Sequence, residues 1–146
     1  MPANDMSFTI YKTKATKKSL TLILSEGEDV IKCIEQAMRE NNIDICEVSD
    51  LDGVFKDGTI TYFIGNNFRT KRIAGKSAYQ THGRYEIKKG QFTGNMHIVL
   101  KEGASALTAT PSVLVASEDF KVLLHFHEVE ELNPRTGEQF DIEKGV

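Results

Sequence analysis

Alternating apolar and polar positions recur along much of the chain and predict strands. The clearest case is Leu20 to Leu24, where a leucine at every second position gives the segment one apolar face. The lysine-rich residues 12–18 before it predict an exposed hairpin or an extended edge strand. Further strands are predicted at residues 8–11, 43–48, 84–87, 96–100, 112–115 and 121–127.

One segment has helical rather than strand spacing. Its apolar residues form a single stripe on a helix, at Val30, Ile31, Ile34, Ala37 and Met38. Ser25 precedes the segment and Glu28 follows three residues later, which predicts a capping box at the start of the helix. Asn41-Asn42 suits a helix end, because asparagine tolerates the left-handed conformation. We predict the helix at about residues 28–41.

Turn signals separate the predicted strands. Asp57-Gly58 lies between residues 54–55 and 59–63, and this arrangement predicts a β-hairpin. Gly65-Asn66-Asn67 predicts another turn, and Gly90 and Gly94 lie between the strands predicted at residues 84–87 and 96–100. Together the patterns predict an α+β fold, in which a mostly antiparallel β-sheet packs with one main α-helix.

Length and composition predict one globular domain. The chain has 146 residues, of which 40% are apolar and 27% charged, so we expect a single domain over residues 1–146. Its core is predicted at about residues 8–127, followed by an acidic C-terminal segment at 128–146. Two cysteines without a Cys-x-x-Cys pair indicate neither a disulfide framework nor a metal motif. Without a visible signal peptide or membrane span, we expect a cytoplasmic protein with no membrane partner.

Charge is unevenly distributed although the formal net charge is only −3. A net negative charge argues against nucleic-acid binding unless basic residues are segregated. Residues 69–89 carry seven basic residues and one acidic residue, whereas residues 128–144 are rich in glutamate. Two interpretations stay open: two solvated faces, or an anion-attracting patch beside an acidic tail. If residues 69–89 fold as strands, alternation dilutes the patch.

Two segments of the chain resemble the PPC family, the plants and prokaryotes conserved domain. The first is Gly27-Glu28-Asp29-Val30-Ile31, followed by the helix and Glu40-Asn41-Asn42-Ile43. The second is Gly83-Arg84-Tyr85-Glu86-Ile87, then Gly94-Asn95-Met96-His97-Ile98-Val99-Leu100. The resemblance spans about residues 20–127 in the family's order, which is more specific than either motif alone.

The resemblance implies a PPC-like domain that forms a homotrimer, with sheet edges and loops at the subunit interfaces. It also implies DNA as a partner, because the family name is attached to DNA binding. In plant members an Arg-Gly-Arg-Pro segment in the minor groove precedes the domain. The only Gly-Arg here is Gly83-Arg84, which lies inside a predicted strand, so DNA binding rests on the resemblance.

Many prokaryotic relatives resemble metal proteins, with a His-x-His strand and a later Gly-Gly-His. In this chain Asn95 occupies the first histidine position and only His97 matches. The later motif is replaced near Thr108-Ala109-Thr110-Pro111. A zinc site needs three or four N, S or O ligands from the protein, and one imidazole is too few, so we predict no metal at this site and no other cofactor. A replacement metal site from His97, His125 and His127 is the alternative.

Four residues of the second segment are candidate ligand-binding residues: Arg84, Glu86, Asn95 and His97. Arg84 and Glu86 share one face of a predicted strand, which favours a cross-strand or intersubunit ion pair. The functional alternative is a pocket in which the Arg84 guanidinium holds a carboxylate or phosphate. Glu86 and His97 would then be the groups available for proton transfer.

Catalytic signatures are missing from the sequence. There is no Gly-x-Ser-x-Gly elbow, no phosphate-binding glycine loop, and Cys33 lies within the predicted helix, where nothing lowers its pKa. The sequence therefore favours a non-enzymatic oligomeric regulatory or interaction module of the PPC type. The alternative is a small-molecule- or metal-binding protein with a site near His97 at a subunit interface.

Overall fold

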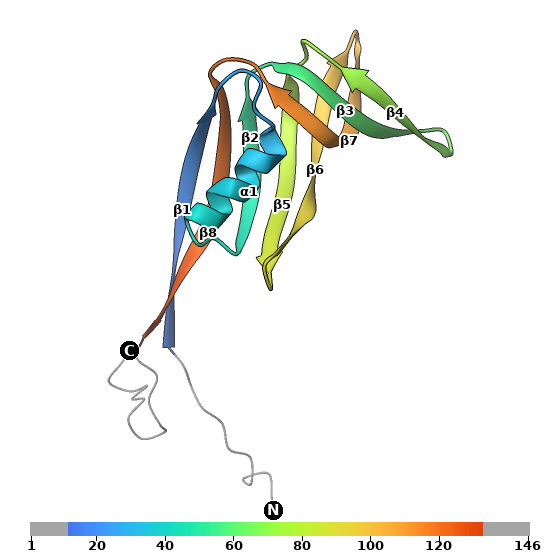
Figure 1. Cartoon of the computed structure of the whole chain (residues 1–146). Coiled ribbons are helices and arrows are strands. Elements are labelled where there is room, and N and C mark those ends of the chain that lie inside the picture. Colours follow the sequence, from blue (N-terminus) through green and yellow to red (C-terminus); the bar gives the residue numbers. More distant parts are fainter. Residues whose placement is uncertain (1–11, 133–146) are drawn as a thin grey trace, which may run out of the picture. The chain divides into compact units, whose positions relative to one another are not determined.

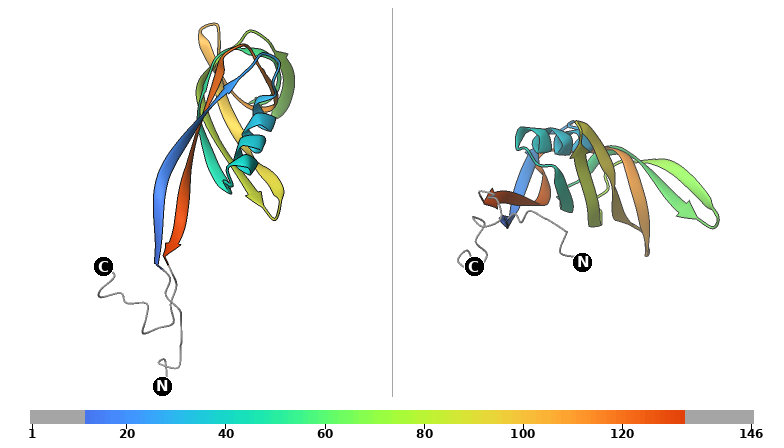
Figure 2. Two further views of the ribbon diagram at one scale, coloured as in Figure 1. Left: turned by 60° about the vertical axis from the view of Figure 1, so that its left-hand side comes forward. Right: turned by 90° about the horizontal axis from the view of Figure 1, so that it is seen from below.

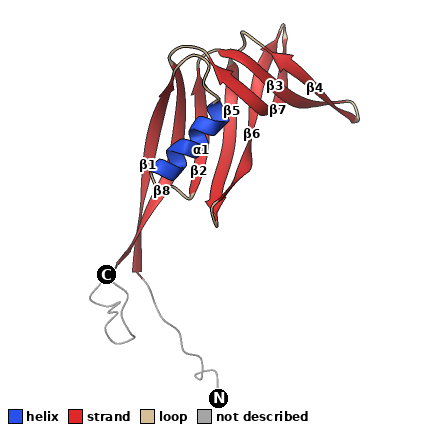
Figure 3. Cartoon of the chain, viewed as in Figure 1, coloured by secondary structure: helices blue, strands red, loops and turns tan. Residues whose placement is uncertain are grey.

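The computed structural model describes residues 12–132 and contains eight strands and one helix in this range (Figures 1 and 3). In chain order these are β1 (Lys12–Leu24), α1 (Val30–Glu40), β2 (Ile45–Asp52), β3 (Phe55–Ile64), β4 (Asn67–Ile73), β5 (Ala78–Lys88), β6 (Gln91–Glu102), β7 (Ser105–Ala116) and β8 (Phe120–Leu132). The predicted strand at residues 8–11 lies outside the described residues.

All eight strands belong to one sheet, in the order β1-β8-β2-β5-β6-β7-β3-β4. The pairings of β2 with β5 and β8, of β6 with β5 and β7, and of β3 with β4 and β7 are antiparallel. Figure 2 shows α1 against one face of the sheet. The predicted α+β fold is therefore confirmed.

The described chain divides into two compact units. Residues 18–126 form the larger unit, whereas residues 12–17 and 127–132 belong to the second. The second unit thus contains the first part of β1 and the last part of β8. Every candidate site residue except His127 lies in the larger unit.

Helix α1 begins and ends close to the predicted residues, but its cap differs. The N-cap is Asp29, whose side chain accepts a hydrogen bond from the Lys32 N–H. The prediction that Ser25 is the cap is therefore wrong. Glu28 does reach back, because its Oε1 accepts from the Ser25 N–H at 3.0 Å. The predicted stop is confirmed, with Asn41 as the C-cap and Asn42 at a φ of 54°.

The predicted hairpin at Asp57-Gly58 is wrong, since β3 runs without interruption from Phe55 to Ile64. The Asp57 side chain accepts from the Gly58 N–H at 2.8 Å, and the register with β7 shifts between Phe55 and Asp57. An Asp-Gly pair can thus mark an irregularity inside a strand as well as a turn. The turn at residues 65–67 is confirmed between β3 and β4.

Strand β4 was not predicted from the sequence. It places Arg69, Lys71 and Arg72 at one edge of the sheet, whereas Arg84 lies on β5. Three strands, β6, β7 and β3, separate β4 from β5 in the sheet order. The basic stretch is therefore divided between distant strands, whereas the sequence suggested a division only between the two faces of adjacent strands.

The core lies between α1 and the sheet. Val30, Ile34, Ala37 and Met38 are the buried residues of α1. Sheet residues that share this core include Phe55 and Phe120, whose ring centroids are 5.4 Å apart. Within residues 12–132, the 11-residue α1 is too short to cross a bilayer, and no helix longer than α1 is present in that range.

Candidate functional site

The four candidate ligand-binding residues lie on the neighbouring strands β5 and β6. Arg84 lies directly opposite Asn95 in the register, and Glu86 lies opposite Thr93. Arg84, Asn95 and His97 alternate with the buried residues Tyr85 and Met96. Because side chains alternate between the two faces of a strand, these polar groups project from the face opposite the core.

The directly opposed imidazoles of His82 and His97 are the main feature that the sequence did not predict. His82 on β5 lies opposite His97 on β6, so their Cα atoms are about 5 Å apart. Thr110 of β7 adds a hydroxyl group, with its Oγ1 3.1 Å from His97 Nδ1. This hydrogen bond leaves Nε2 of His97 available for another partner.

The row of polar groups continues toward the edge of the sheet. Thr110 lies opposite Thr61 of β3, and Thr61 lies opposite Thr70 of β4. The hydroxyl oxygens of Thr61 and Thr70 are 3.3 Å apart. His82, His97 and three threonines therefore form a polar row across β5, β6, β7, β3 and β4. Such a row supplies hydrogen-bonding groups without one dominant charge.

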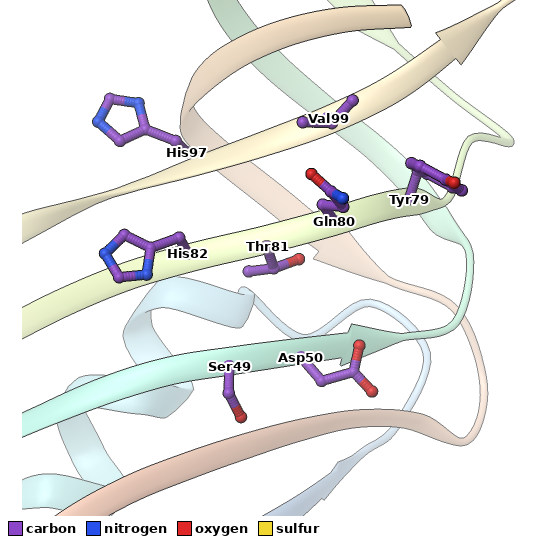
Figure 4. A pocket seen from close by; sticks show the side chains of 8 residues that line it. All are labelled: Ser49, Asp50, Tyr79, Gln80, Thr81, His82, His97 and Val99. Carbon is purple, nitrogen blue, oxygen red and sulfur yellow. The ribbon is translucent and has the colours of Figure 1, made fainter.

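A hollow of about 400 Å³ borders the two histidines (Figure 4). In Figure 4 the imidazoles of His82 and His97 project side by side, and Ser49 and Asp50 lie on the neighbouring strand β2. The remaining lining residues are Tyr79, Gln80, Thr81 and Val99. Asp50 can accept and Gln80 can both donate and accept, so this hollow suits a small polar ligand.

A second hollow, of about 490 Å³, lies on the other side of His97. It is lined by residues of β3, β4 and β7, among them Phe63, Phe68 and Leu107, together with His97 of β6. This hollow is more apolar than the first. His97 lines both hollows and is the only one of the four predicted ligand-binding residues that lines either.

Arg84 and Glu86 form no cross-strand ion pair within the described chain, and the intersubunit ion pair stays a prediction. Among the described residues neither side chain has an ion-pair partner within 4.0 Å. Glu47 of β2 lies opposite Arg84 on one side and opposite His125 of β8 on the other. Arg84 is thus an exposed cation with acidic neighbours, and its role as a ligand-binding residue stays a prediction.

The three histidines proposed as a replacement metal site are not brought together. His125 lies on β8, which β2 and β5 separate from His97 on β6. His127 belongs to the smaller unit. No group of three histidine, cysteine or acidic side chains suited to a metal ion occurs within the described residues. His82 is the nearer neighbour of His97.

Burial keeps both thiols protonated at neutral pH. Desolvation is the main cause that raises the pKa of Cys33 to about 11, and Glu28 adds to it, with Oε2 3.3 Å from the Cys33 Sγ. Desolvation likewise raises the pKa of Cys46 to about 11. Both cysteines are free. Neither thiol therefore provides a thiolate nucleophile.

The sequence contained one signal that would have found His82. Thr81-His82-Gly83-Arg84 places His82 two residues before Arg84, so both side chains belong to the same strand face. Ser49 and Asp50 gave no such signal, because the register between β2 and β8 shifts between Val48 and Asp50. Such an irregularity leaves two successive polar residues exposed. A sequence prediction that assumes strict alternation of buried and exposed residues cannot detect it.

Comparison with known proteins identifies the fold. No family model matches the chain, and no curated protein matches it significantly. Among solved structures, a metal-containing protein from Archaeoglobus fulgidus is similar over 86% of this chain and 89% of its own, with 16% identity and a TM-score of 0.63. A plant- and prokaryote-conserved (PPC) protein from Pyrococcus horikoshii is similar over 86% and 85%, with 15% identity and a TM-score of 0.60.

A third similar structure carries a functional name. It is described as a "putative DNA-binding protein" from Ralstonia eutropha JMP134, and it covers 75% of this chain and 76% of its own, with 16% identity and a TM-score of 0.57. At such identities the likeness establishes the fold alone. The predicted PPC-like α+β fold is confirmed.

The metal site that the family resemblance implies does not fit the residues of this chain. Asn95 carries an amide and faces Arg84 across the strands. Thr110 provides a hydroxyl group at His97, where the resemblance places a further imidazole. One imidazole from these positions is too few for a zinc site. Any metal bound here would have to use His82, which is outside the family's pattern.

Proposed function

We propose that this protein is a non-enzymatic, homotrimeric binding module of the PPC type that binds DNA. The observation that carries this proposal is the fold shared with the Ralstonia protein and the PPC protein over three quarters or more of the chain. Fold likeness does not by itself determine a ligand, so the DNA contact needs a surface and a test of its own.

Exposed apolar side chains at the tip of the β3–β4 hairpin support the assembly of several copies. Phe63 and Ile64 are each 56% exposed and Phe68 is 75% exposed. Phe63 and Phe68 pack edge to face, with centroids 5.0 Å apart. Contiguous exposed apolar groups are typical of contact surfaces between proteins. The two free thiols suit the reducing cytoplasm in which we place the protein.

The β5–β6 turn supplies the basic surface that we assign to DNA. Lys88 and Lys89 are exposed at this turn, and Lys89 has a φ of 53°. Arg39 of α1 reaches the same turn, where its Nη2 donates to the Gly90 carbonyl at 3.1 Å. This corner therefore carries three cations, and Lys88 and Lys89 have no acidic partner in the described chain. Such a group of cations suits contacts with phosphate groups.

We expect the double variant Lys88→Gln, Lys89→Gln to bind duplex DNA more weakly and with a weaker salt dependence. Each lost phosphate contact lowers the slope of log K against log salt by about 0.9, so the slope should fall by about 2. Fluorescence anisotropy at four salt concentrations measures this slope. Light scattering of the same sample should give a mass about three times that of the 16.3 kDa chain.

Lys56→Gln is the matched control for this titration. Lys56 pairs with Glu26 at 2.7 Å, away from the β5–β6 turn, so its loss should leave the slope unchanged. Absence of binding at 50 mM salt would remove DNA from the proposal. A mass of a single chain would contradict the trimer.

A second candidate function is favoured by the opposed imidazoles: binding of a small ligand at His82 and His97. Imidazole nitrogens are good ligands for zinc and copper, and two of them on adjacent strands can share one ion. The hydrogen bond between Thr110 and His97 Nδ1 leaves Nε2 available to bind such a ligand. Water or a residue of a neighbouring copy would complete the coordination.

Zinc is a suitable probe of this site. We expect His82→Ala and His97→Ala each to weaken zinc binding at least tenfold in isothermal titration, because a single remaining imidazole holds the ion poorly. His125→Ala is the control, since His125 lies on β8 with β2 and β5 between it and His97. An equal loss in the control, or no zinc binding by the unmodified chain, would refute this second function and leave DNA binding untouched.

A further inference from the structure

Strand β4 is a bare edge of the sheet. It pairs with β3 over an unbroken register from Gly58↔Ile73 to Ile64↔Asn67, and it is the last strand in the sheet order. Within the described chain no other strand or backbone hydrogen bond covers its outer side. Alternate backbone N–H and C=O groups of β4 therefore point away from the sheet, where an extended peptide can pair with them.

The charges on β4 limit what can pair with it. The strand carries Arg69, Lys71 and Arg72 and no acidic residue. Arg72 bonds Asp57 of β3, with its Nη2 2.9 Å from Oδ2, and Lys71 pairs with Glu102 of β6. Arg69 has no ion-pair partner among the described residues. Like charges repel a second β4, whereas an acidic strand meets complementary charge.

The two faces of β4 also differ in polarity. Phe68 and Thr70 lie on the open face, where Phe68 packs on Phe63 and Thr70 bonds Thr61. Arg69 and Lys71 alternate with them and share the other face with the buried Ile73. A matching partner strand therefore needs apolar residues alternating with acidic residues.

The chain itself contains one segment with this pattern, outside the described residues. It is Glu138-Gln139-Phe140-Asp141-Ile142-Glu143, in which Phe140 and Ile142 alternate with Gln139, Asp141 and Glu143. Any extended peptide with this alternation presents its apolar residues to one side and its acidic residues to the other. We infer that β4 is the docking edge for this acidic segment of a second copy of the chain, which adds to the sheet through backbone hydrogen bonds and is selected by Arg69.

Binding of a synthetic peptide tests this inference. The peptide consists of residues 137–146 with a fluorescent label. It is titrated with a full-length variant whose own acidic segment is disabled by Phe140→Ser, Asp141→Lys and Glu143→Lys. We expect saturable binding that Arg69→Glu weakens at least tenfold, because the substitution replaces attraction with repulsion. A peptide of the same composition in scrambled order should bind at least tenfold more weakly.

Lys88→Glu is the matched charge reversal, since Lys88 lies on β5 and is separated from β4 by three strands. It should leave peptide affinity within twofold. Circular dichroism and a thermal melt establish that each variant is folded. No binding at 1 mM peptide, equal affinity with Arg69→Glu, or equal affinity for the scrambled peptide would overturn the docking edge. The DNA titration depends on Lys88 and Lys89 instead, so either proposal can fail without the other.

Discussion

Replacement of Phe120 by alanine is expected to lower the free energy of unfolding by about 4 kcal/mol. Phe120 is fully buried, and its ring packs against Phe55 with centroids 5.4 Å apart. Gly53 lies so close that a Cβ atom there would be 2.6 Å from the Phe120 ring. Removing this ring leaves a cavity that rigid neighbours cannot fill, which adds to the lost transfer energy.

Urea denaturation followed by circular dichroism measures this change, at one protein concentration because assembly shifts apparent stability. Tyr79→Ala is the control, since Tyr79 is 60% exposed and its ring contacts the Lys101 ammonium at 4.7 Å. We expect that variant to lose less than about 1 kcal/mol. Equal losses for the two variants would show that the Phe55–Phe120 pair does not anchor the core.

Gly94→Ala is expected to cost about 3 kcal/mol although it adds only one methyl group. Gly94 has a φ of 142°, which a side chain disfavours. A Cβ atom at this position would lie 2.2 Å from the Arg84 carbonyl oxygen and 2.7 Å from the Tyr85 Cα. Both atoms belong to the backbone of β5, so relief of the clash requires β5 and β6 to separate locally.

Gly103→Ala separates the effect of backbone conformation from that of the clash. Gly103 also has a positive φ, of 62°, but a Cβ atom added there would meet no other atom within 4 Å. We expect this variant to lose about 1 kcal/mol, the cost of a left-handed residue alone. Differential scanning calorimetry of both variants measures the difference, and equal melting temperatures would contradict the close approach at Gly94.

Local patterns predicted the elements whose faces differ in polarity. The stripe from Val30 to Met38 and the alternation from Leu20 to Leu24 both appear in the structure, because each element buries one side. Strand β4 was missed since only Ile73 of its seven residues is buried. An edge strand outside the core carries no apolar alternation, so its sequence resembles a loop.

The candidate site was predictable only in part, because it depends on register. His97 could be chosen from its motif, but its partner His82 follows from the pairing of β5 with β6. That register is set by the turn at Lys89-Gly90, where both residues have positive φ. Arg84 and Glu86 share a strand, yet nothing in the sequence indicated that Glu47 would lie beside Arg84.

His97 forms part of the wall of two adjoining hollows, of which the second is the more apolar. Its Nδ1 is occupied by Thr110, which leaves a single ring nitrogen to be shared between them. Two ligands that each bonded this nitrogen, one from either hollow, would therefore compete for it. For such a pair of ligands, each would lower the affinity of the protein for the other, and by thermodynamic reciprocity the effect would have the same size in both directions.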